Sequence, residues 1–287
     1  MKTCPLLSIL SLIALTAFAG SSDDSKYSDE AENTAKVLRE KIPAEIKTLG
    51  DHAWAGEYYH GDGRGVNVSL LLAPKSGYLF EWHGCLGLYD RNYGAVSEAN
   101  GRIRLDFTFE NKREGFQGIA EEFIPIPWGP RRYLVPADDV VGFCNDVNGG
   151  SEPREYAHGS YLLRAGDEKK NVFGFPSVPQ KFQAYLLKRP IAAGIVAVGL
   201  PTTRPSVCDW NFKDIPVTLN VGKDHGLLPG MELHVVKPDN IVESVRITKV
   251  EDEKSEGVMT QIGMEEECPA VGWRLSTRFR WKVEKNK

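Results

Sequence analysis

The chain has 287 residues, of which 41% are hydrophobic and 10% aromatic, values that fit packed globular domains and exclude a disordered chain. Its 35 Lys and Arg residues and 39 Asp and Glu residues give a net charge of −4 at pH 7. Because binding to a phosphate backbone needs a basic surface, this balance argues against a nucleic-acid partner.

The first 19 residues have the pattern of a signal peptide. Lys2 precedes an apolar run at 5–17, and Ala17 and Ala19 flank Phe18 in the small-x-small arrangement that signal peptidase cleaves. The run is shorter than the roughly 20 residues that a membrane-spanning helix needs. The sequence therefore predicts cleavage near Ala19 and a periplasmic or secreted mature chain without a membrane span.

Residues 20–50 are predicted to form a polar leader and a helical segment. The leader, 21–28, is expected to be loose. From residue 29, apolar side chains recur at steps of three and four and so share one helix face: Ala31, Ala35, Leu38, Ile42, Ile46 and Leu49. Pro43 is expected to break this helix into two segments, and Gly50 to end it.

Residues 51–165 are predicted to form a β domain. Aromatic and β-branched runs predict strands at 54–60, 66–73, from 77 onward, and at 95–98, 102–109, 132–135 and 158–164. Asn100 and Gly101 favour a type I′ hairpin turn. A bend is expected near Gly87 and Asp90, irregular chain at 110–130 with its three prolines, and a short helix at 137–148.

A linker at 166–190 and a second β domain at 191–282 follow. The linker is charged at first and proline-rich later, with a short helix at 181–187. Strands are predicted at 191–198, 215–220, 231–236, 242–250, 257–262 and 272–276, the short, even spacing of a small barrel or sandwich. The predicted fold is mainly β, with two small β-barrel or sandwich domains after a short N-terminal helical segment.

The cysteines are expected to form disulfides, because export leads to an oxidising compartment. Removal of the signal peptide leaves Cys85, Cys144, Cys208 and Cys268, which allow three pairings. The domain boundary favours one bridge within each domain, Cys85–Cys144 and Cys208–Cys268.

The stretch 217–236 carries a glycine-punctuated turn between two strands, with Gly222, Gly226 and Gly230 as its marks. Roughly over residues 215–276, this pattern resembles the small β-barrel modules of the periplasmic rod-shape-determining scaffold and of a periplasmic flagellar-assembly protein. The resemblance implies an interaction or scaffold module and transfers no active site. The first domain resembles only uncharacterised exported bacterial proteins, which implies no function.

One group of side chains in the first domain is chemically distinctive. Its members come from neighbouring predicted strands and turns: His60, Asp62, Trp82, His83, Tyr89 and Asp90. Imidazoles and carboxylates of this kind could hold Zn or Mn, and the aromatic rings could stack on a sugar. The alternative is structural, with Asp62 in a turn and the histidines at strand ends.

Two further groups have both a functional and a structural interpretation. Glu57 with Glu81 or Asp106 could serve glycoside hydrolysis, which needs two carboxyl groups about 5 to 9.5 Å apart. Arg131 and Arg132 beside Trp128 could line a site for a carboxylate or sugar, or simply pin a loop. The sequence contains no GxSxG, HExxH, P-loop or GxGxxG motif.

These patterns predict a non-catalytic binding or scaffold protein of the periplasm or cell envelope, without a cofactor and with an envelope protein or carbohydrate as partner. Two alternatives are a hydrolase or metal-dependent enzyme acting on envelope carbohydrate, and a carrier of small apolar ligands. An enzyme predicts a pocket where at least two of Glu57, His60, Glu81, His83 and Asp90 converge. A carrier predicts an apolar cavity, and a scaffold a flat apolar patch.

Overall fold

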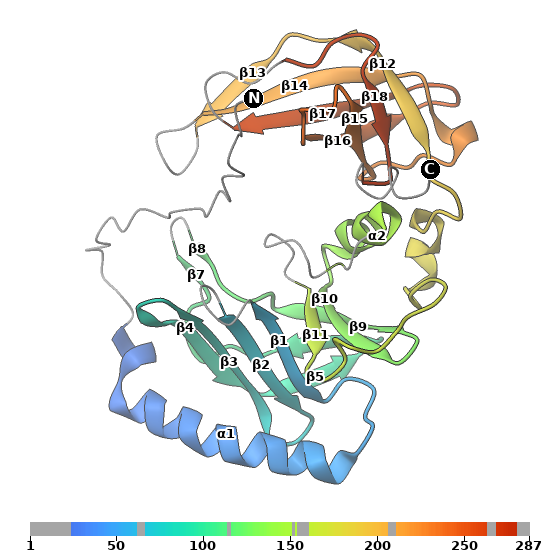
Figure 1. Cartoon of the computed structure of the whole chain (residues 1–287). Coiled ribbons are helices and arrows are strands. Elements are labelled where there is room, and N and C mark those ends of the chain that lie inside the picture. Colours follow the sequence, from blue (N-terminus) through green and yellow to red (C-terminus); the bar gives the residue numbers. More distant parts are fainter. Residues whose placement is uncertain are drawn as a thin grey trace, which may run out of the picture.

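A computed structural model describes residues 24–61, 67–113, 116–150, 153, 161–205, 211–262 and 268–279. The fold is mainly β, with two barrel-like sheets and an N-terminal helix, as the sequence predicts. Figure 1 shows the N-terminal helix α1 along the outside of the first sheet and the short helix α2 between the two sheets.

The N-terminal helix α1 (Asp29–Leu49) is continuous. Ser28 caps it, because its Oγ accepts a hydrogen bond from the Ala31 N–H at 3.2 Å. Pro43 lies inside the helix, so the predicted break there is wrong. Proline removes one backbone hydrogen bond, but packing of the apolar stripe on the sheet holds the axis.

The apolar stripe of α1 covers the outer face of two central strands. Ala35 and Ile42 are fully buried and form a cluster with Ala73 and Leu79 of the sheet. Before α1, the leader forms a 3₁₀ turn, η1 (Asp24–Tyr27), so its described part is not loose as predicted.

The first sheet has nine strands. In sheet order they are β4 (Gly87–Gly94), β3 (Gly77–Gly84), β2 (Asn67–Ala73), β1 (Gly56–Gly61), β11 (Leu162–Arg164), β10 (Arg131–Pro136), β9 (Glu122–Trp128), β6 (Arg102–Leu105) and β5 (Val96–Ala99). The chain after β6 returns to β4, where the Thr108 N–H donates to the Tyr93 carbonyl at 3.2 Å. A separate two-stranded ribbon joins β7 (Lys112–Arg113) and β8 (Phe116–Gln117).

The register of the strands determines which side chains form the inner face of the first sheet. Tyr58, Leu70 and Phe80 are direct neighbours across β1, β2 and β3, and all three are buried. The turn between β5 and β6 has the predicted geometry. Asn100 and Gly101 both have positive φ, at 53° and 72°, as a type I′ turn requires.

Strand β4 lies where a bend was predicted, and strand β9 lies within the stretch 110–130 that was predicted to be irregular. Pro125 and Pro127 lie in β9, opposite Leu134 and Arg132 of β10. Because the two prolines are two residues apart, their missing N–H groups point to the same side. That side faces away from β10, so the ladder between the strands survives.

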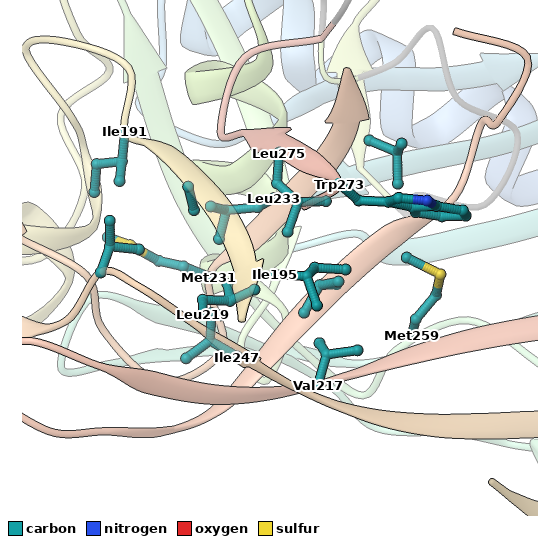
Figure 2. Close-up of a cluster of buried hydrophobic side chains, with 14 of the residues drawn as sticks. Ile191, Ile195, Val217, Leu219, Met231, Leu233, Ile247, Met259, Trp273 and Leu275 are labelled. Carbon is teal, nitrogen blue, oxygen red and sulfur yellow. The ribbon is translucent and has the colours of Figure 1, made fainter. Parts of the chain in front are cut away.

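The second sheet closes on itself. Its strands are β12 (Ala192–Val198), β18 (Arg274–Ser276), β15 (Glu232–Lys237), β16 (Ser244–Val250), β17 (Ser255–Ile262), β14 (Asn211–Leu219) and β13 (Thr202–Pro205). Strand β12 pairs with both β18 and β14, which closes a ring of six strands and leaves β13 attached to the outside of β14. The apolar side chains inside this ring include Ile195, Leu233, Met259 and Trp273 (Figure 2).

Helix α2 (Val140–Gly149) joins the two sheets. It packs on β10 through Phe143 and Cys144 and reaches the second sheet through Asn145, whose Nδ2 donates to the Gly230 carbonyl at 3.0 Å. At the helix end, a Cβ on Gly149 would lie 2.2 Å from the Phe279 ring, so this close contact requires glycine. The short helices η3 (Gln180–Tyr185) and η4 (Lys223–His225) complete the described elements.

The predicted disulfide Cys85–Cys144 is wrong. Cys85 is exposed in the β3–β4 turn, whereas Cys144 is a buried free thiol. Strands β2, β1 and β11 separate β3 from β10, on which Cys144 packs, and each strand spacing is about 4.8 Å. Membership of one sheet therefore does not bring the sulfurs together.

The second predicted bridge is not formed either. Cys268 is an exposed free thiol whose Sγ accepts a hydrogen bond from Lys213 Nζ at 2.9 Å. Its predicted partner, Cys208, lies outside the described residues.

Candidate functional site

Three of the six predicted site residues lie in one row on the inner face of the first sheet. His60 pairs with Val68, Val68 with Trp82, and Trp82 with Asp90, so all four side chains share a face. The row continues the buried inner face formed by Tyr58 and its neighbours. Strand register thus places His60, Trp82 and Asp90 on one face of the sheet, although β2 and β3 lie between His60 and Asp90.

Asp90 already has a cationic partner inside the protein. Lys26 of η1 places its Nζ 2.9 Å from Asp90 Oδ1, and the two side chains are 1% and 0% exposed. Sequence analysis missed Lys26, because a single lysine in a polar leader gives no sign of burial. The ion pair ties the start of the described chain to β4.

The remaining predicted residues do not join the row. His83 is exposed, and a register shift in β3 separates it from Trp82. The Tyr89 ring packs edge-on against Trp82, with centroids 6.0 Å apart, and its backbone carbonyl accepts a hydrogen bond from the Tyr27 hydroxyl. Asp62 lies outside the described residues.

Two of the carboxylates proposed for hydrolysis, Glu81 and Glu57, differ in their surroundings. Glu81 lies on the outer face, where it receives hydrogen bonds from Arg39 and Arg91, and Glu57 is exposed on β1. Burial opposes ionisation of Glu81, but the two arginines outweigh it and lower the pKa of this carboxyl. The cluster therefore fastens α1 to the sheet.

The described part of the chain does not bring a set of metal ligands together. Within it, no group of three or more His, Cys, Asp and Glu side chains is placed to hold a metal ion. A shallow hollow beside η4 is lined by charged residues, Asp224 and 251–254. This lining does not suit an apolar ligand.

The second sheet carries a surface that the sequence did not single out. We name it the β13 ribbon: β13 with the parts of β14 and β17 at 211–214 and 260–262. Its cross-strand pairs Arg204–Phe212 and Phe212–Ile262 lie outside the buried cluster of the barrel. Strands β14 and β17 are thus longer than closure of the barrel requires.

Side-chain contacts order one face of the β13 ribbon. Arg204 lies over the Phe212 ring, 4.3 Å from its centroid, and donates to Asp214 at 2.7 Å. Thr260 also donates to Asp214 at 2.7 Å, and the hydrogen bonds from Thr260 and Arg204 lower the pKa of this carboxyl. Side-chain contacts therefore order the ribbon in addition to the backbone pairing of its strands.

The edge of the β13 ribbon is open and partly apolar. Within the described residues, β13 pairs with β14 and with no other strand, and all four of its residues are exposed. Exposed apolar side chains flank it: Val196, Val198, Leu200 and Ile262. Leu200 is 88% exposed.

Comparison with known proteins yields no relative. No family model matches the chain, and no curated protein or solved structure does. No described helix combines the length and apolar character needed to cross a bilayer.

Proposed function

We propose that this chain is an exported, non-catalytic binding or scaffold protein of the periplasm or cell envelope, and that the β13 ribbon is its docking element for a protein partner. The open edge of β13 carries the proposal. An edge strand presents unpaired backbone N–H and C=O groups, which another chain can extend by adding a strand.

Three features of the ribbon support strand addition. The Arg204–Asp214–Thr260 contacts order the ribbon, which reduces the entropy lost on binding. Apolar side chains such as Val198 and Leu200 lie beside the edge, where a partner could bury them. The ribbon also lies outside the six-stranded ring, so an added strand would leave the barrel core undisturbed.

The resemblance of residues 215–276 to envelope scaffold modules points in the same direction. These residues form β14 to β18, the larger part of the second sheet. The rival enzymatic role has less support, because Glu81 and Asp90 are both held in ion pairs with basic side chains of the protein itself.

Site-specific photo-crosslinking in intact cells tests the proposal. A photoreactive amino acid at Thr203 or Leu200 is expected to give a discrete adduct with an envelope protein. The same residue at Val242, an exposed position outside the ribbon, is the matched control and is expected to give none. Val198→Glu should weaken the Thr203 adduct, because it places a charge among the exposed apolar side chains beside the edge of β13.

Two results would reject the proposal. One is equal crosslinking from ribbon and control positions, which would indicate random encounters. The other is turnover of envelope polysaccharide by the purified protein, which would favour the hydrolase.

A further inference from the structure

Contacts of two helices, α2 and η3, join the two sheets. Each buried apolar cluster of the described residues takes its strands from one sheet, and partly buried Tyr185 of η3 packs against a cluster on either side. Figure 1 shows α2 between the sheets. We name the contacts of α2 and η3 with residues 229–232 and 279 the joint. An interface of this kind permits relative motion of the domains that it connects.

Hydrogen bonds cross the joint. The Asn145 side chain of α2 donates to the Gly230 carbonyl at 3.0 Å and accepts from the Glu232 N–H at 3.3 Å. At the end of α2, the Phe279 N–H donates to the Gly149 carbonyl at 3.1 Å. Two backbone N–H groups of the second sheet side, those of Glu232 and Phe279, are therefore bonded to α2. Opening of the joint would expose both of them to water.

Three carboxylates gather at the joint. Asp146 follows Asn145 in the last turn of α2, where the helix dipole disfavours a negative charge. Glu232, whose N–H bonds to Asn145, belongs to β15. Asp139 lies at the start of α2 and accepts a hydrogen bond from the Tyr161 hydroxyl at 2.9 Å. All three acidic residues are partly buried, so water solvates their charges poorly.

Two arginines face these carboxylates. Arg246 lies directly opposite Glu232 in the pairing of β15 with β16, but its side chain is exposed. Arg278 lies beside the end of α2, where a Cβ on Gly150 would be 3.4 Å from its Nε. Because water weakens the attraction of an exposed cation, Arg246 only partly offsets the burial of the carboxylates.

The charge of the joint changes with pH. Burial, then the Glu232 and Asp139 carboxylates, raise the pKa of Asp146 to about 7. Exposed Asp138 adds a negative charge next to Asp139. Burial lowers the pKa of His234, on β15, to about 4, so its imidazole is neutral over the same range. Asp146 is thus largely protonated near pH 6, and above pH 8 it adds a negative charge to the joint.

We propose that the joint is a pH-dependent hinge, in which ionisation of Asp146 favours an open state with α2 detached from the second sheet and both sheets folded. In the open state, α2 stays on β10 through Phe143 and Cys144, and water solvates the Asp146 and Glu232 carboxylates. Because the β13 ribbon belongs to the second sheet, opening changes its orientation relative to the first sheet. The inference goes beyond the scaffold function and does not depend on it.

The sign of the pH dependence follows from the Asp146 proton. The closed state holds this proton more tightly than the open state, in which the carboxyl is in water and has its ordinary pKa of about 4. Opening therefore releases a proton between pH 4 and pH 7, and the ratio of open to closed molecules rises with pH through this window. Above it, the ratio levels off.

Amide hydrogen exchange of the full mature chain, followed by NMR, tests the proposal. The protection factors of the Glu232 and Phe279 N–H groups should fall by about tenfold or more from pH 5 to pH 8. At each pH they should also be about tenfold or more below that of the Ile247 N–H, which bonds to the Met231 carbonyl within the second sheet. The difference arises because the joint opens without unfolding of that sheet.

Asp146→Asn should abolish the fall in protection, since an amide does not ionise. Asp239→Asn, at an exposed position outside the joint, is the matched control and should retain it. A measurement on the wild type keeps the test independent of how the variants fold. The Asp146 carboxyl carbon should titrate with a midpoint well above the ordinary value of about 4.

Four results would overturn the hinge. These are protection of Glu232 and Phe279 equal to that of Ile247, protection that does not change with pH, a fall that Asp146→Asn retains, and titration of Asp146 at its ordinary value. The first would show that the joint breaks only when the protein unfolds. None of the four affects crosslinking from the β13 ribbon, so the two proposals fail separately.

Discussion

At the residue scale, the buried pair Lys26–Asp90 has the largest expected effect on stability. Two charges leave water together, and each is stabilised only while the other is present. The pair connects η1 with β4, 64 positions apart in sequence. The described residues of η1 therefore pack on the first sheet.

Replacing Asp90 with Asn should destabilise the protein by about 3 kcal/mol or more, because Lys26 then remains buried without its counter-charge. Replacing both, as K26M with D90L, should recover much of the loss, since an apolar pair avoids the unpaired charge. Urea unfolding measures both effects. Glu251→Gln removes an exposed partner of Lys249 and is the control, which should leave the free energy of unfolding close to that of the wild type.

The role assigned to the Lys26–Asp90 pair would be wrong if Asp90→Asn cost no more than that control. It would also be wrong if the double replacement were no better than Asp90→Asn alone.

At the element scale, helix α2 brings acidic groups together where it meets the second sheet. Burial, then the nearby Glu232 and Asp139 carboxylates, raise the pKa of Asp146 to about 7. Burial also raises the pKa values of Glu232 and Asp139, and Arg246 partly opposes this. This contact is therefore sensitive to pH.

The folded state holds the Asp146 proton more tightly than the unfolded state. Between the ordinary pKa of about 4 and the folded value of about 7, unfolding releases a proton, so stability falls as pH rises through this window. Asp146→Asn should remove that loss and stabilise the protein at pH 8 by on the order of 2 kcal/mol relative to its effect at pH 4.

Urea unfolding of wild type and Asp146→Asn across this pH range provides the measurement. Asp239→Asn, at an exposed position outside this group of carboxylates, is the matched control and should not change the slope of stability with pH. Parallel pH curves for wild type and Asp146→Asn would contradict the assignment.

At the scale of the whole molecule, alternation and turn chemistry were sufficient to predict the fold class. The Asn100–Gly101 turn pairs β5 with β6, in which Ile103 and Leu105 alternate with arginines, and this hairpin is confirmed. The strand predicted at 102–109 ends at Leu105. Strand β9 was missed because Pro125 and Pro127 act as breakers in most sequence contexts.

Long-range partners could not be predicted, because local sequence does not encode them. Closure of the second barrel depends on β12 meeting β14 and β18, and the Asp90 environment depends on a lysine from the leader. The disulfide prediction failed for the same reason, since a cysteine count gives no distances. The shared face of His60, Trp82 and Asp90 could be suggested because β1 to β4 follow one another along the chain as a meander.

Export of the whole chain stays a prediction with a direct test. Protein purified from its source should begin at Gly20, which intact mass and N-terminal sequencing would show. Ala19→Arg should block processing, whereas Phe18→Leu, at the tolerant middle position, should not. Full-length chain in the cytosol would contradict export and, with it, the proposed envelope role.

The labelling rate of the buried Cys144 thiol measures motion inside the protein. Burial raises its pKa to about 12, and only the thiolate attacks a thiol reagent, so α2 must leave β10 before modification can occur. Exposed Cys85 and Cys268 react without such an event. The delay between fast and slow labelling therefore reports how often the helix joining the two barrels detaches, with no engineered probe.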